Sequence, residues 1–297
     1  MAEAETADPQ WNAPVRQHSR GGFYLAIAFC LLSMSSVQFG AAFSRPAMQE
    51  LGPFGTTWLR LCWAAIVLMI VVRPPLLSFS RRQWATAAAL GAVMAMMTLC
   101  FFAAIERIPL GLAVAIEFLG PLTVATIFGG RGWRLLCPVI AALGVLCISW
   151  DGSAWVADTI GVLFALGAAV GWGGYIVLTK YAGQQFEGLE GLCLSLLFAA
   201  LVATPFGFHQ AQLGLSPEAL VTTGLLAVLV PLFPYALELM ALRRMNASAF
   251  GLLMSLEPAI GASAGFIVLG QAMAALQLIG VALVVATSAV GTASSQS

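Results

Sequence analysis

Long apolar segments separated by short polar links occupy most of this 297-residue chain. A membrane-spanning helix needs about 20 mostly apolar residues, and ten stretches of that kind can be marked. They cover residues 22–43, 53–72, 84–104, 109–129, 134–151, 159–181, 189–208, 218–241, 247–269 and 272–291. The longest links, 73–83 and 208–217, are too short to hold a water-soluble domain. The pattern therefore predicts an all-α, polytopic membrane protein with ten transmembrane helices.

The composition agrees with this prediction. Hydrophobic residues make up 60% of the chain and charged residues 9%, whereas a soluble domain carries about 25% charged residues. The chain is therefore expected to be an integral membrane protein in contact with lipid.

The lysines and arginines are distributed unevenly between the two ends of the predicted helices. If the N-terminus is cytoplasmic, ten of them fall on that side: Arg16, Arg20, Arg73, Arg81, Arg82, Arg131, Arg134, Lys180, Arg243 and Arg244. The other side holds Arg45 and Arg107. Because cytoplasmic loops carry the excess of positive charge, residues 1–21 and 292–297 are predicted to be cytoplasmic tails.

A shift of 137 residues places the first five predicted helices over the last five. It brings Arg107 onto Arg244 and Pro121 onto Pro258. Because five is an odd number, the two halves must cross the membrane in opposite directions. The sequence thus predicts two inverted five-helix repeats, 22–151 and 159–291, and such repeats place a transporter's substrate site at their interface.

Two predicted helices contain a glutamate and a proline near their middle, in the stretches EFLGPL and SLEPA. Glu117 and Glu257 are the acids, and an ionisable group at membrane depth indicates a functional site by default. Pro121 and Pro258 should kink these helices, because proline cannot donate to the carbonyl four residues before it. We interpret the glutamates as a site for a substrate ammonium group or a proton. The alternative is that a protonated glutamate bonds to neighbouring backbone and holds a kinked helix in place.

Two further charged residues are candidates for the same site. Arg60 lies within the second predicted helix and could bind a substrate carboxylate, pair with a buried glutamate or extend its side chain to the membrane surface. Glu238 follows Pro231 and Pro234, which should break the eighth predicted helix, and a broken helix usually lines a cavity. Glu238 could instead be an interfacial carboxylate near the arginine pair that follows it.

Several polar and aromatic residues could line a cavity between the repeats. Gln38 and Tyr175 are equivalent under the shift of 137, and Trp172 and Tyr235 are expected nearby. A cavity wall with a few hydrogen-bonding groups would suit a small polar substrate. Hydrogen bonding between helices alone is the alternative.

Several blocks of the sequence resemble the EamA-type branch of the drug/metabolite transporter superfamily. They are GFYLAIAFCLLSMSSVQFGAAFSRPAM, WLRL, IPLGLAVAIEFLGPLTVA, PYALELMALRR and FGLLMSLEPAIGA. Within this branch they are most similar to the threonine/homoserine exporters of bacterial inner membranes. The resemblance implies ten helices, an inverted repeat, and a central cavity bordered by the first, third, fourth, sixth, eighth and ninth of them. It also implies export of amino acids or related metabolites. Gln271 departs from the pattern, because the exporters typically have an acidic residue there.

A secondary exporter, driven by proton antiport, is therefore the leading functional hypothesis. The expected partners are a small-molecule substrate, protons and membrane lipid, with no nucleic acid, cofactor or metal; the oligomeric state is not predicted. The substrate could also be a metallophore or a drug-like compound. An intramembrane enzyme and a channel are the competing classes, but no catalytic serine–histidine or metal-binding pattern supports an enzyme.

Overall fold

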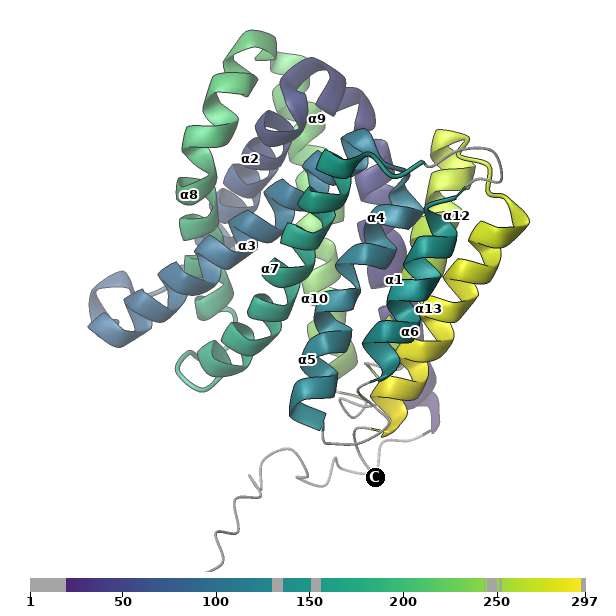
Figure 1. Cartoon of the computed structure of the whole chain (residues 1–297). Coiled ribbons are helices and arrows are strands. Elements are labelled where there is room, and N and C mark those ends of the chain that lie inside the picture. The colour runs from purple at the N-terminus through teal and green to yellow at the C-terminus, as the bar shows by residue number, and fades with distance from the viewer. Residues whose placement is uncertain are drawn as a thin grey trace, which may run out of the picture.

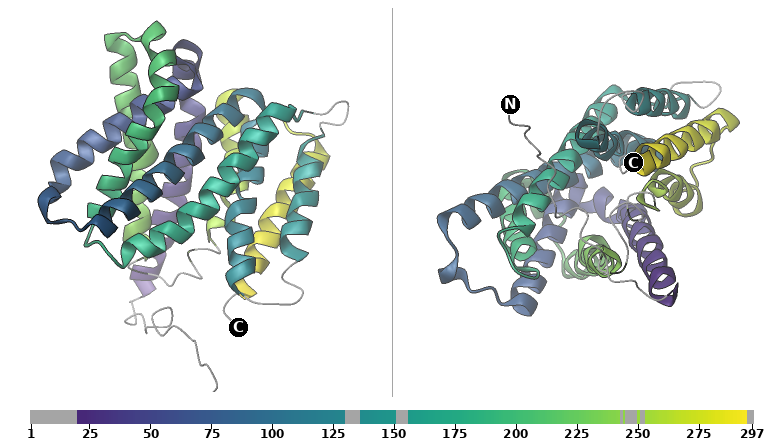
Figure 2. Two further views of the ribbon diagram at one scale, coloured as in Figure 1. Left: turned by 60° about the vertical axis from the view of Figure 1, so that its left-hand side comes forward. Right: turned by 90° about the horizontal axis from the view of Figure 1, so that it is seen from below.

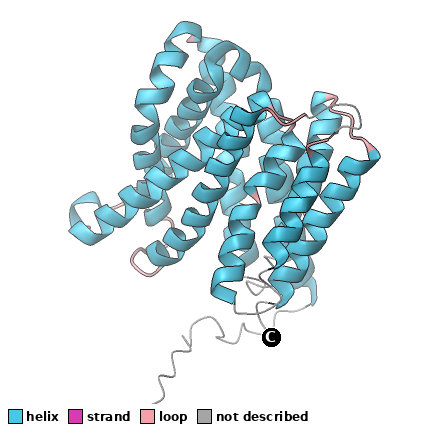
Figure 3. Cartoon of the chain, viewed as in Figure 1, coloured by secondary structure: helices cyan, strands magenta, loops and turns pink. Residues whose placement is uncertain are grey.

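A computed structural model describes residues 20–129, 136–150, 156–242, 244, 250 and 253–294. Within these ranges the chain folds into helices joined by short links, and no β-strand is assigned there (Figure 3). Most of the two predicted tails, together with Arg131, Arg134 and Arg243, lies outside the described residues. The prediction of an all-α membrane protein is confirmed for the described part of the chain.

The helices overlap the predicted apolar segments, except for one short turn in the link 73–83. The helix that begins at Arg45 starts eight residues before its predicted segment, and the one that ends at Gly214 extends six residues beyond its own. In chain order the helices are α1 (Arg20–Phe43), α2 (Arg45–Val72), η1 (Leu76–Ser78), α3 (Arg81–Arg107), α4 (Leu110–Glu117), α5 (Leu119–Gly129), α6 (Leu136–Ile148), α7 (Thr159–Gly183), α8 (Glu190–Gly214), α9 (Pro217–Ala227), η3 (Val228–Leu232), α10 (Phe233–Leu242), α12 (Glu257–Leu269) and α13 (Ala275–Ser294).

Six of these segments are long and apolar enough to cross a membrane. They are Gly22–Phe43, Arg45–Val72, Arg81–Arg107, Thr159–Gly183, Glu190–Gly214 and Pro217–Glu238. Shorter apolar helices cover Leu110–Val124, Val139–Ile148, Glu257–Leu269 and Ala275–Val290. Each shorter helix falls within one of the four remaining predicted spans, and the total of ten spans stays a prediction.

The predicted helix breaks are present, but they take the form of helix ends. The segment 109–129 divides at Phe118 into α4 and α5, and 218–241 divides at η3. Pro121 lies in the first turn of α5 and Pro258 in the first turn of α12, where a missing N–H group costs no hydrogen bond. The backbone keeps helical dihedral angles at Phe118 (φ −65°, ψ −15°) and at Leu256 (φ −77°, ψ −10°), so the predicted kinks at these prolines stay a prediction.

The helices pack so that α4 lies at the centre. α2 and α8 run together at one edge of the molecule, and α6 and α13 run together at the opposite edge (Figure 1). α1 packs on α10 and α12, while α7 packs on α3, α4 and α5. Figure 2 shows these groups from two further sides. All eight residues of α4 are buried, so Glu117 at its end is placed inside the protein.

Glycine allows one of the closest helix contacts. A side-chain carbon at Gly120 in α5 would lie 2.0 Å from the carbonyl oxygen of Ala169 in α7. Small residues let helices approach in this way inside membranes. Gly120 is equivalent to Glu257 under the shift of 137, so the first repeat has direct helix contact where the second repeat has an acid.

Candidate functional site

Glu257 and Gln38 form a buried pair between α12 and α1. Glu257 is the first residue of α12 and 4% exposed, and Gln38 on α1 is 1% exposed. Gln38 Nε2 donates a hydrogen bond of 3.1 Å to Glu257 Oε1. The two residues are 219 positions apart in the chain. The packing of α1 on α12 therefore brings one predicted site residue from each half into direct contact.

Among the described residues, the second polar atom of each side chain finds no hydrogen-bond partner. These atoms are Gln38 Oε1 and Glu257 Oε2, and both are buried. Leaving a buried acceptor unpaired costs about 1–3 kcal/mol, so such atoms are rare unless a ligand or a proton satisfies them. The pair thus has an unfilled capacity to accept hydrogen bonds.

Glu117 lies close to this pair from the side of α4. It is 8% exposed, and its charge is near enough to that of Glu257 for the two to interact. Its neighbour Phe118 makes an edge-to-face contact with Trp172, with ring centroids 5.5 Å apart. Two acidic groups that approach each other inside the protein repel when both are ionised, which favours a proton or a cation between them.

Glu238 on α10 extends the acidic cluster. Ser33 Oγ on α1 donates a hydrogen bond of 2.8 Å to Glu238 Oε1, and the charge of Glu238 acts on Glu257. Arg244 donates instead to the carbonyl of Met240. In the part of the chain that is described, Glu238 forms no ion pair with Arg244. The structure therefore does not support the alternative that Glu238 is an interfacial carboxylate paired with this arginine.

Tyr175 and Tyr235 lie together beside the cluster. Their ring centroids are 6.2 Å apart, and both rings lie within electrostatic reach of Glu238. Tyr235 also interacts electrostatically with Glu117. The two tyrosines therefore form the aromatic side of the same acidic region.

Arg60 does not join this region. Its side chain is 4% exposed, so it does not reach the membrane surface as one alternative had it. Its Nε and Nη2 donate to the carbonyl oxygen of Val230, at 3.2 and 2.9 Å. Among the described residues it forms no ion pair with a glutamate, so no glutamate of the cluster is neutralised by it.

Two serines of α1 have roles that sequence reasoning missed. Ser33 bonds to Glu238, and Ser36 Oγ donates a hydrogen bond of 2.8 Å to the carbonyl of Leu229. A possible signal was their spacing: residues three apart share a helix face, and this face meets the broken helix. Small hydroxyl residues in an apolar helix are common, however, and the spacing alone does not name their partners.

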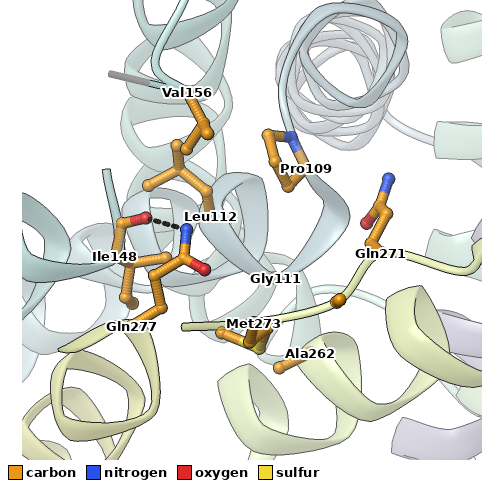
Figure 4. Close-up of a pocket in the computed structure, with 10 residues that line it drawn as sticks. Pro109, Gly111, Leu112, Ile148, Val156, Ala262, Gln271, Met273 and Gln277 are labelled. Carbon is orange, nitrogen blue, oxygen red and sulfur yellow. Dashed lines mark hydrogen bonds between the residues drawn. The ribbon is translucent and has the colours of Figure 1, made fainter. Parts of the chain in front are cut away.

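A small pocket of about 110 Å³ lies at the end of the bundle where α4 begins (Figure 4). Gln271 lines it and accepts, through Oε1, a hydrogen bond of 3.0 Å from the backbone N–H of Leu110. Gln277 also lines the pocket, and its Nε2 donates a hydrogen bond of 2.9 Å to the carbonyl oxygen of Ile148. An acidic residue at position 271, which the resemblance led us to expect, could accept the same hydrogen bond through its carboxylate. Gln271 therefore keeps this contact and removes the negative charge.

The described residues contain no group of three or more histidine, cysteine, aspartate or glutamate side chains placed to hold a metal ion. The cluster is built instead from carboxyl, amide and phenol groups. These groups can donate and accept hydrogen bonds.

The chain is 35% identical over 269 residues to the threonine/homoserine exporter RhtA of Escherichia coli (strain K12), covering 89% of this chain and 90% of that one. It is equally similar to RhtA of Salmonella typhimurium (strain LT2) over the same shares. A protein of known crystal structure has the same fold, with a TM-score of 0.59 and 17% identity over 89% of this chain and 96% of that one.

Residues 159–291 match the EamA-like transporter family. The relatives are transporters, so the prediction of a transporter rather than an enzyme is confirmed. With the apolar helices, they indicate a multi-pass protein of the inner membrane that exports small metabolites. The extent and identity of these matches show that the chain belongs to the EamA-like transporter family.

Proposed function

We propose that this protein exports threonine, homoserine or related small amino acids from the cytoplasm in exchange for protons. The observation that carries the proposal is the buried Glu257–Gln38 pair, with two unpaired acceptor atoms, beside Glu117 and Glu238. An amino acid brings an ammonium group whose N–H donors fit such acceptors. The relatives named as threonine/homoserine exporters support the substrate class.

The proposal includes ten membrane spans in two inverted repeats, 22–151 and 159–291, with both termini in the cytoplasm. The helix contacts support it, because they occur in equivalent sets. α3 packs on α7, and the equivalent helices α10 and α1 pack on each other. α1 packs on α12, as α7 packs on α4 and α5. The family match also coincides with the second repeat.

Coupling follows from competition at one acidic site. A buried carboxyl group binds either a proton or the ammonium group of the substrate, so loading one releases the other. Protons then move inward while the amino acid moves out. Gln38, Glu117 and Glu257 are buried at the junction of α1, α4 and α12, and Glu238 on α10 is half-buried. Relative motion of the two halves would expose this cluster to each side in turn.

Transport by the purified protein in liposomes tests the proposal. A vesicle interior more acidic than the bath should drive accumulation of labelled threonine through molecules that face the bath with their cytoplasmic side. Preloading with unlabelled threonine should produce counterflow, which a carrier shows and a channel does not. A panel of amino acids, aromatic compounds and metallophore-like compounds defines the substrate class. If no amino acid is accumulated or exchanged, while another class is, the proposed substrate is wrong.

A further inference from the structure

The contact between Gln38 and Glu257 uses only half of each side chain. Gln38 Nε2 donates to Glu257 Oε1, at 3.1 Å. The remaining atoms are Gln38 Oε1 and Glu257 Oε2, and both are acceptors when the glutamate is ionised. Gly261 lets α12 pack closely here, because a side-chain carbon there would lie 2.9 Å from Val114 Cγ2 and 3.3 Å from Gln38 Oε1. The pair thus presents two unpaired acceptors from two different helices.

We propose that Gln38 and Glu257 form a two-state pair that accepts either a proton or a substrate ammonium group, and that Gln38 selects for the ammonium. In the first state, Glu257 carries a proton on Oε2 and donates it to Gln38 Oε1, which gives the pair its second hydrogen bond. In the second state, the ionised pair receives N–H groups of the substrate on these same two oxygens. The inference rests on the proposed function and adds Gln38 as a specificity-determining residue.

The chemistry of the pair restricts its ligands. A ligand that offers an oxygen without a hydrogen would add a third acceptor, so a carboxylate is excluded from this position. Hard metal cations such as Ca²⁺ take six to eight oxygen ligands, far more than the two free acceptors of the pair. An ammonium group has three donors and no acceptor, which matches two acceptors of the pair and leaves one donor for another group.

The surrounding charges favour the same class of ligand. The charges of Glu117 on α4 and Glu238 on α10 interact with that of Glu257, and the rings of Tyr175 and Tyr235 lie 6.2 Å apart near Glu238. Arg60 donates its hydrogen bonds to Val230. Within the described residues, no arginine forms a salt bridge with any of the three glutamates, so the region attracts a cationic group.

The proton balance of one cycle follows from the two states. When the ammonium group binds from the cytoplasm, the proton on Glu257 leaves to cytoplasmic water. After the substrate is released on the other side, a proton from that side returns to Glu257 Oε2. A zwitterion moves outward and a proton moves inward, so each cycle carries one positive charge into the cell.

The test compares threonine with 2,3-dihydroxybutyrate, in which a hydroxyl group replaces the ammonium group. In liposomes, the wild-type protein should exchange threonine and discriminate strongly against the hydroxy acid. Gln38→Met keeps the length of the side chain but removes both amide ends. We expect it to raise the KM for threonine exchange about 10- to 100-fold, the range for a lost hydrogen bond to a charged group, and to reduce the discrimination by a similar factor.

Ser36→Ala is the matched control on the same helix, because Ser36 bonds to Leu229 and not to the pair. It should leave the preference for threonine unchanged. Gln38→Asn, with a shorter side chain, should raise the KM and reduce the discrimination by an intermediate factor. It replaces Gln38→Met in the test if that variant aggregates. A second readout is proton release into an unbuffered solution on adding threonine, which should follow threonine occupancy in the wild type and vanish in Glu257→Gln.

The outcomes separate the two proposals. If the wild-type protein exchanges threonine, and neither Gln38 variant changes the KM or the preference over the hydroxy acid, the role of Gln38 is wrong and the proposed function stands. Uphill transport driven by a sodium gradient instead of a proton gradient would also overturn the two-state pair. If the wild type carries no amino acid, the proposed function itself fails.

Discussion

Arg60 on α2 holds the carbonyl oxygen of Val230 with two hydrogen bonds, at 3.2 Å from Nε and 2.9 Å from Nη2. Val230 lies in η3 with φ −150° and ψ 115°, values that are not helical. Nη1 of Arg60 donates to Ser44 Oγ at 3.3 Å, and the guanidinium group lies 4.3 Å from the centre of the Phe102 ring. Backbone that leaves the helical pattern at membrane depth must be satisfied within the protein. Arg60 thus stabilises the break that precedes Tyr235 and Glu238.

Arg60→Lys should therefore destabilise the protein even though it retains the positive charge. A lysine ammonium lacks the planar fork that reaches Val230 and Ser44 together, so we expect a loss of about 1–3 kcal/mol. Thermal unfolding of the purified protein in detergent measures it. Arg73→Lys is the control, because Arg73 is exposed and bonds only locally to Ile70; its effect should stay within about 0.5 kcal/mol. Equal unfolding temperatures for both variants would contradict this role of Arg60.

Glu257→Gln should abolish proton-driven export while the protein remains folded and inserted. The neutral amide imitates the protonated carboxyl group, so it cannot exchange a proton for a substrate. Uptake of threonine into liposomes with an acidic interior is the measurement. Glu187→Gln, which changes an exposed carboxyl group in the link between α7 and α8, should transport normally.

A Glu257→Gln variant that still accumulates threonine at the normal rate would place the coupling elsewhere. Glu117→Gln is then the next variant to test, because Glu117 is the neighbouring buried acid. Loss of uphill transport in Glu117→Gln alone would move the proton site from α12 to the end of α4.

Gly120→Ala should weaken the contact between α5 and α7. The added carbon would lie 2.0 Å from the Ala169 oxygen, so the helices must move apart, and overpacking of this kind costs about 1–3 kcal/mol. Gly183→Ala at the end of α7 is the control, since no atom from another part of the molecule lies within 4 Å of its added carbon, and its effect should stay within about 0.5 kcal/mol. Thermal unfolding should separate the two variants, and a Gly120→Ala protein as stable as the wild type would show that α5 and α7 are not so close.

The cytoplasmic position of the C-terminus can be checked with a reporter enzyme that is active only in the periplasm. Fused after Gly291, it should be silent, because an even number of spans returns the chain to the side on which it began. The same reporter placed after Arg107 should be active, since this end of α3 is predicted to lie outside. Activity after Gly291 would mean that the number of spans is odd.

The membrane class of this protein could be predicted from the sequence because it depends on local composition. Each apolar segment must satisfy its own backbone hydrogen bonds in lipid, and a helix is the structure that does so within one segment. For the same reason Glu117 and Glu257 stood out: an acid inside such a segment is costly wherever the helix packs. The shift of 137 residues was likewise visible in the chain alone.

The partners of the polar side chains were decided by tertiary structure. Gln38 and Glu257 are 219 residues apart, Ser33 and Glu238 are 205 apart, and Arg60 meets Val230 across 170 residues. A sequence places each residue on a helix, but the rotation and approach of two helices determine which atoms meet. Several acceptors were open to Arg60, and only the folded chain places the freed carbonyl of a broken helix within its reach.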